Sequence, residues 1–235
     1  MQKRRLIILG AIILVLIFIA ASTVSTSAVV AGRKHIPKKL ADVPILNYHK
    51  VDDLHHALSL SPQEFEEQMK YLYDNGYHSI TPEQLLAYLK YGKNLPEKPI
   101  MITFDDGYLD NYVNAYPIMQ KYGFIGTIFI VTGLISNDPR YMSWDNVREM
   151  QKNGFTFGSH TAHHVPLNTL TADGVNEELS GSSNEMERQL GQKPRFFAYP
   201  TGAYDLNIEK MVHQAGFKAA FTIRYGQVGL DSDLY

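Results

Sequence analysis

Two neighbouring carboxylates stand at the end of an apolar run. Asp105 and Asp106 directly follow Pro99–Phe104, whose composition predicts a buried strand. Adjacent like charges at such a position repel each other and lose solvation. Asp-Asp-Gly is an ordinary strand-ending turn. The alternative is a cation site, in which one carboxylate binds the ion and the other takes a proton from water.

A group of candidate ligands follows a later predicted strand, 155–158. The sequence SHTAHH spans residues 159–164, and His160 and His164 are four residues apart. This spacing predicts that a helical turn brings them together. His163 is the alternative partner of His160. Two imidazoles and one carboxylate from 105–106 make a set that suits catalytic zinc, and also non-haem iron, cobalt or nickel.

Strands and helices alternate along the chain from Asp42 onward. Capped helical patterns begin at Ser61, Thr81, Ser143, Thr171 and Asp205, and glycines follow their ends. This order indicates an α/β fold with a mostly parallel sheet, either a βα barrel or an open doubly wound sheet. The predicted strands are 43–48, 100–104, 127–132, 155–158, 196–199 and 218–223. In both folds the site lies at the carboxyl ends of the strands.

Three motifs together resemble the polysaccharide deacetylases, the NodB homology domain of carbohydrate esterase family 4. ITFDDG at 102–107 is similar to the first motif of that family, and SHTAHH at 159–164 to the second. FAYPTG at 197–202 is similar to the third, a groove wall that ends in Pro-x-Gly. The resemblance covers roughly residues 43–225, which is nearly the whole chain after its N-terminal segment.

The resemblance implies a distorted (β/α) barrel and a metal-dependent hydrolase that removes acetyl groups from N-acetylated sugars. Asp105 would then be the base, and one divalent ion would bind to Asp106, His160 and His164. Zinc is the favoured ion, with cobalt and nickel as alternatives. The expected substrate-binding residues are Tyr199, Pro200 and Thr201, with the backbone N–H of Thr201 near the oxyanion.

Two departures from the family pattern leave the proton donor open. Ala198 stands where many members have an arginine two residues before the proline, although Arg195 lies nearby. The late Leu-x-His motif, whose histidine serves as the general acid, is not visible after Ile223. His49 follows the first predicted strand and is therefore a further candidate for substrate binding.

The substrate expectation also rests on resemblance. The opening VPILNYH at 43–49, the Tyr-Pro-x-Gly form and the missing late histidine are similar to the branch that acts on poly-β-1,6-N-acetylglucosamine. The alternatives are a peptidoglycan N-acetylglucosamine deacetylase and a weakly catalytic glycan-binding protein. A serine hydrolase ranks last, because the Gly-x-Ser-x-Gly elbow is absent from the sequence.

The N-terminus predicts a membrane contact. Lys3, Arg4 and Arg5 precede a stretch without charge from Leu6 to Gly32, longer than the roughly 20 residues of a membrane span. Residues 1–32 are therefore an anchor inserted through 6–31 or a cleaved signal peptide, with the anchor favoured, 33–42 a basic linker, and 43–235 the catalytic domain. The domain would be extracytoplasmic, in a single-pass protein of the cell membrane, or secreted after cleavage.

Composition narrows the partners further. The net charge is −2, so no global field points to nucleic acid, and no cysteine is present. Thiolate metal sites, disulfides and a cysteine nucleophile are thereby excluded. The expected partner is an N-acetylated glycan polymer.

Overall fold

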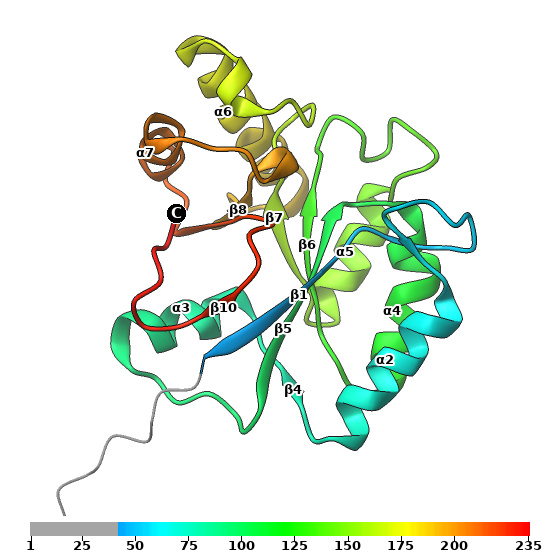
Figure 1. Ribbon diagram of the computed structural model, residues 1–235. Coiled ribbons are helices and arrows are strands. Elements are labelled where there is room, and N and C mark those ends of the chain that lie inside the picture. The colour runs from blue at the N-terminus through cyan, green and yellow to red at the C-terminus, as the bar shows by residue number, and fades with distance from the viewer. Residues whose placement is uncertain (1–41) are drawn as a thin grey trace, which may run out of the picture. The chain divides into compact units, whose positions relative to one another are not determined.

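A computed structural model of the chain describes residues 42–235, which form one compact unit (Figure 1). The anchor or signal peptide predicted for 1–32 lies outside the described residues, as does the linker except for its last residue. Among the described residues, no helix is long and apolar enough to cross a membrane. The helices are α2 (Pro62–Asp74), α3 (Pro82–Tyr91), α4 (Tyr116–Lys121), α5 (Trp144–Lys152), α6 (Ala172–Leu190) and α7 (Leu206–Gln214).

A curled, mostly parallel sheet forms the centre. Its strands follow the order β10, β1, β5, β6, β7, β8, β9, and β4 pairs with β5 beside this path. Among the described strands of this sheet, only β10 runs antiparallel to its neighbour, β1, and β2 and β3 form a separate small pair. The strands are β1 (Val43–Tyr48), β2 (Lys50–Val51), β3 (Ser59–Leu60), β4 (His78–Ser79), β5 (Pro99–Asp106), β6 (Thr127–Ile130), β7 (Thr156–Ser159), β8 (Phe196–Ala198), β9 (Ala219–Phe221) and β10 (Gln227–Val228).

The barrel expected from the family resemblance is present as a half-barrel. No strand ladder joins β9 to β1 or β10 within residues 42–235, so the described sheet has two edges. The segment after β9 instead crosses to β1, where its strand β10 pairs with β1. It then returns to β9, where the Ala220 N–H donates to the Leu234 carbonyl at 2.7 Å. The doubly wound alternative is not the fold that forms.

Local signals place the helices where the sequence predicts them. Ser61 and Glu64 form a capping box at the start of α2, and Thr81 and Gln84 form another at the start of α3. Gly92 ends α3 in the left-handed conformation that glycine adopts without strain. Short π-helical and 3₁₀ segments were not predicted: η1 (Asn111–Ala115), η2 (Leu167–Thr169) and η3 (Pro200–Gly202).

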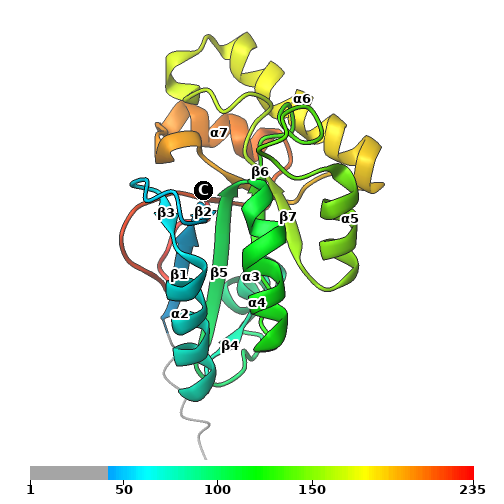
Figure 2. The same cartoon turned by 90° about the vertical axis from the view of Figure 1, so that its right-hand side faces the viewer.

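The two faces of the sheet have different roles. Helices α2, α4 and α5 cover one face of β5 to β7 (Figure 2), where Phe104 and Ile128 belong to the largest apolar cluster. Since side chains alternate along a strand, Thr103, Asp105 and Phe129 point to the other, concave face. The reactive carboxylate at the end of β5 therefore belongs to the concave face.

Candidate active site and metal centre

Both aspartates lie at the carboxyl end of β5 and are almost completely buried, with Asp105 5% and Asp106 6% exposed. Asp106 has φ +73°, in the left-handed region, and is therefore unlike an ordinary strand residue. Consecutive side chains of a strand point to opposite faces. The left-handed backbone at Asp106 changes the direction of its carboxylate in addition. The two acids consequently meet different partners.

Asp106, His160 and His164 form a candidate metal centre. One ligand atom from each of the three lies within 4.8 Å of the others. The Nε2 atoms of His160 and His164 are 3.6 and 3.2 Å from Asp106 Oδ1. Two imidazole nitrogens and a carboxylate oxygen facing a common point are the donor set of a catalytic zinc or similar divalent ion. The residues present therefore fit the ion that the sequence predicts.

His160 is oriented for ligation by a backbone carbonyl. Its Nδ1–H donates to the Ala198 carbonyl at the end of β8, at 2.8 Å, which leaves the Nε2 lone pair free. Burial lowers the pKa of His160 to about 4, against the opposing effect of Asp106. The ring is thus neutral at physiological pH, which is the form that binds metal.

A bent loop, and not a helical turn, brings the two ligand histidines together. Residues 160–164 contain no helix, and Thr161 and His164 have φ +68° and +60°. The His164 N–H donates to Thr161 Oγ1 at 2.9 Å and stabilises this bend. The sequence spacing correctly predicts the pair, but the predicted turn is wrong, because the left-handed residues fold the chain back within four positions.

His163, the alternative ligand, is excluded by its contacts. Its side chain is 71% exposed, and its Nδ1 lies 2.7 Å from Glu178 Oε1 on α6. Glu178 Oε2 also accepts the backbone N–H groups of Ala162 and His163, each at 2.9 Å. Glu178 is therefore the residue that fixes the ligand loop, and the sequence analysis missed it. The available signal was a glutamate on the buried stripe of α6, beside Val175 and Leu179.

The candidate base Asp105 has a polar partner on the neighbouring strand. Asn47 Nδ2 donates to Asp105 Oδ2 at 3.0 Å, and Thr103 Oγ1 lies 3.2 Å from Asn47 Oδ1. Burial raises the pKa of the Asp105 carboxyl, whereas the Asn47 hydrogen bond and the nearby His49 and His164 rings lower it. Asn47 was also missed, since its contact depends on the register of β1 against β5.

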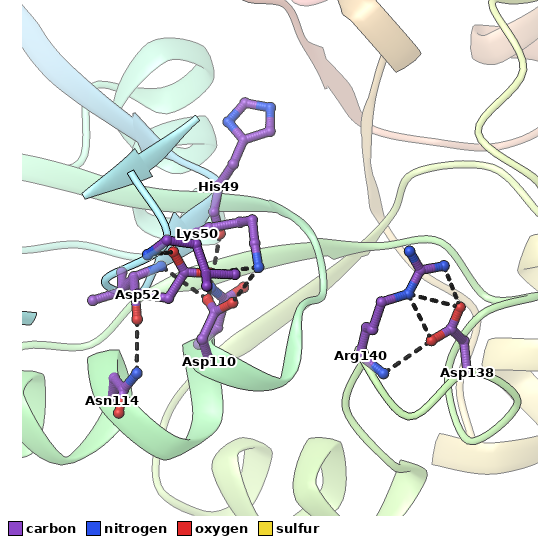
Figure 3. Close-up of polar contacts among 10 residues, drawn as sticks. His49, Lys50, Asp52, Asp110, Asn114, Asp138 and Arg140 are labelled. Atoms are coloured by element: carbon purple, nitrogen blue, oxygen red, sulfur yellow. Dashed lines mark hydrogen bonds and ion pairs between the residues drawn. The ribbon is translucent and has the colours of Figure 1, made fainter. Parts of the chain in front are cut away.

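His49 lies beside the base without belonging to the metal set. Its Nε2 is 3.9 Å from Asp105 Oδ2. Figure 3 shows its ring pointing away from a polar cluster that holds the adjoining backbone. In this cluster Asp110 accepts the Val51 N–H at 2.9 Å and faces Lys50 Nζ at 3.2 Å. Asn111 and Asn114 of η1 donate to the His49 and Val51 carbonyls, so the π-helical turn anchors the His49 segment.

The third motif contributes mainly through its backbone. Tyr199 is 2% exposed and stacks on Tyr204 with ring centroids 4.7 Å apart, so the structure gives its side chain a packing role. Pro200 is buried, and Thr201 is exposed with φ +59°. The substrate contacts expected of these three residues stay predictions. Arg195 does not replace the missing arginine, because its Nη1 faces Glu83 at 3.8 Å on the surface.

Backbone strain gathers at this site. Four of the seven described non-glycine residues with positive φ are Asp106, Thr161, His164 and Thr201. A threonine in this region is an outlier, and such conformations persist where surrounding contacts enforce them. The concentration of outliers around one set of buried acids and imidazoles supports a functional role for the site.

Comparisons with known proteins agree with this site. A sequence model of the polysaccharide deacetylase family matches residues 92–220, more than half of the chain. YxkH of Bacillus subtilis (strain 168), named as a candidate polysaccharide deacetylase, is 34% identical over 198 residues, which is 84% of this chain and 70% of the relative. The chain therefore belongs to the polysaccharide deacetylase family, and it is an enzyme of that class.

A second relative and a solved structure add detail. The poly-beta-1,6-N-acetyl-D-glucosamine N-deacetylase of Staphylococcus aureus (strain N315) is 27% identical over 267 aligned positions, covering all of this chain and 91% of the relative. The deacetylase PplD of Streptococcus pyogenes, solved in complex with acetate, superposes with a TM-score of 0.79 at 27% identity, over 83% of this chain and 89% of PplD. The half-barrel is thus like that of solved deacetylases.

Proposed function

We propose that this chain is a metal-dependent N-deacetylase of poly-β-1,6-N-acetylglucosamine that works outside the cytoplasm. The observation that carries the proposal is the convergence of Asp106, His160 and His164 within 4.8 Å, with Asp105 and His49 beside them. Asp106, His160 and His164 would hold a divalent ion, with zinc favoured, and the ion would supply Lewis acidity to the acetamide carbonyl and to the attacking water.

Asp105 serves as the base. Its carboxylate is buried and lies next to the ligand Asp106, and Asn47 holds one of its oxygens. The other oxygen takes a proton from the attacking water. The hydrogen bond from the Asn47 amide to one carboxylate oxygen fixes the orientation of the Asp105 carboxylate. It leaves the other oxygen available for the proton.

His49 donates the proton that the leaving amine requires. The ring lies beside Asp105 and is held by the hydrogen bond from Asn111 to its backbone carbonyl. Water adds to the acyl carbon, the carbon–nitrogen bond breaks, and acetate and a free amino sugar leave. Thr201 contributes its backbone N–H to the developing oxyanion, as the third motif predicts.

The choice of polymer rests on likeness to relatives. The Staphylococcus aureus relative is named for poly-β-1,6-N-acetylglucosamine and spans this whole chain. The segment 43–49, which supplies both Asn47 and His49, is one of the features that favour the same branch. A peptidoglycan deacetylase is the alternative within the family.

Acetate release by the purified protein tests the function. The substrates are β-1,6- and β-1,4-linked N-acetylglucosamine oligomers and peptidoglycan fragments, each with zinc or cobalt and with chelator. We expect metal-dependent release from the β-1,6 oligomers, abolished in Asp105→Asn while bound metal is retained. Release from peptidoglycan fragments alone would select the alternative substrate.

A binding-only role is the second candidate, and Ala198 in place of the family arginine favours it. It predicts affinity for the oligomers without acetate release, and no change of affinity in Asp105→Asn. Calorimetric titration of the same oligomers separates the two roles.

A further inference from the structure

A large cavity lies on the concave face of the sheet, directly next to the candidate base. Its volume is about 850 Å³, and Asp105, Asn47 and His49 line one end. The wall continues along β1, β6 and β9, over helix α3, and along the segment after β9, which adds the polar residues Arg224, Gln227 and Asp233. Much of this wall is apolar and comes from Leu85, Leu86, Leu89, Phe129, Ala219 and Phe221.

The size of this cavity exceeds what an acetyl group needs. An apolar cavity of about 150 Å³ already accommodates benzene, and ligand pockets in general range from roughly 300 to 1,000 Å³. The half-barrel makes room for this space, because no strand ladder joins β9 to β1 within the described residues and the segment after β9 forms part of the wall instead.

The geometry of the amide bond indicates which part of the substrate enters the cavity. In an N-acylated sugar the acyl chain and the sugar lie on opposite sides of the carbon–nitrogen bond. A polymeric sugar has to stay on the solvent side of the site, while the carbonyl carbon meets Asp105 and the ligands. The acyl chain therefore points past Asp105 into the cavity that this residue lines.

We infer that this enzyme also hydrolyses N-acyl groups longer than acetyl, namely straight-chain butyryl and hexanoyl amides of glucosamine oligomers. The inference deepens the proposed function and rests on it. Water adds to the acyl carbon, the amide bond breaks, the carboxylic acid loses its proton, and the amine gains one. No other reactant is required.

The test compares acyl lengths on one oligomer. Glucosamine trimers carrying N-acetyl, N-butyryl or N-hexanoyl groups are incubated with the full chain, and free amine is quantified. Burial of added methylenes favours binding by roughly fourfold each. We expect kcat/KM on the longer amides at or above one tenth of the acetyl value. Values below one tenth overturn the inference.

Filling the cavity supplies the control. Ala219→Leu adds volume to the wall and should lower the hexanoyl-to-acetyl ratio of kcat/KM at least tenfold, with acetyl turnover kept. Ala87→Leu makes the same change on α3 at a half-exposed position outside the cavity and should leave the ratio unchanged. Leu86→Phe tests the same wall if Ala219→Leu does not fold.

The outcomes separate the two ideas. Acetyl hydrolysis without hydrolysis of the longer amides overturns the inference alone. An unchanged hexanoyl-to-acetyl ratio of kcat/KM in a folded Ala219→Leu or Leu86→Phe variant also overturns the inference. Failure to hydrolyse any of the three amides overturns the proposed function, and the inference falls with it.

Discussion

The two adjacent aspartates differ because each meets its own partners. Asp106 turns through a left-handed backbone towards His160 and His164, whereas Asp105 remains on the concave face with Asn47. The same dipeptide can thus hold an ion and retain a base. In this chain an amide from the neighbouring strand holds the candidate base.

Asn47→Leu tests this hydrogen bond at similar side-chain volume. We expect kcat to fall roughly 10- to 100-fold, since a hydrogen bond to a charged group contributes about 1.5–3 kcal/mol. The metal affinity and KM should change little, because Asn47 touches no ligand. Steady-state kinetics and a zinc titration measure both quantities. Ile45→Val, on the same strand, is the control, and an unchanged kcat in Asn47→Leu would contradict the role.

The buried ring of His160 predicts a pH dependence of stability. Its folded-state pKa is about 4, below the ordinary value of 6.5. Between these values the unfolded chain binds a proton that the folded chain excludes, so the free energy of unfolding decreases as pH falls through this window. Below about pH 4 this residue adds no further loss.

Urea unfolding of the metal-free protein between pH 7 and pH 4.5 measures this effect. His160→Gln should show a flatter dependence of the unfolding free energy on pH, since glutamine does not titrate. Equal slopes for the two proteins would mean that His160 is not kept neutral by the fold.

At the scale of elements, helix α6 supports the ligand loop, residues 160–164, which carries the candidate metal ligands His160 and His164. Glu178 accepts two backbone N–H groups of this loop and contacts His163, while Ser182 Oγ lies 2.7 Å from Ser159 Oγ at the end of β7. Both side chains are buried. The polar residues on the inner face of α6 are therefore explained by the loop that they hold.

Glu178→Leu should disrupt this support. It leaves the buried Ala162 N–H and the partly buried His163 N–H without their acceptor, and we expect the free energy of unfolding to fall by about 2–4 kcal/mol. Zinc affinity should weaken roughly 10- to 100-fold, as for other groups that orient metal ligands. Denaturant unfolding and a competitive zinc titration measure the two effects. The exposed neighbour Glu177→Leu is the matched control, and equal zinc affinity in both variants would refute the support role.

At the scale of the whole molecule, the chain combines an apolar N-terminal segment with a curled-sheet domain. We predict that the full chain stays with membranes during alkaline extraction, whereas a variant lacking residues 6–31 does not. Protease added to intact cells should degrade the domain of the tethered protein. Retention of the shortened variant on membranes, or protection from the protease, would count against an extracytoplasmic tether.

The sequence alone predicted the main strands, the capped helices and the candidate reactive residues. Alternation and helical spacing are local properties, so the strands near Asp105 and His160 and the capped helices follow from short stretches of chain. The first two motifs supply the candidate metal ligands and the candidate base because each motif is contiguous in sequence.

Only the tertiary structure decided which residues from distant parts of the sequence contact the candidate base and the ligand loop. Asn47 meets Asp105 through the β1–β5 register, and Glu178 meets the ligand loop through the packing of α6. His163 is excluded from the ligand set by that same glutamate. The half-barrel and its cavity likewise depend on the order and curl of the sheet. These features arise from contacts between residues far apart in sequence, whereas local patterns report only neighbours along the chain.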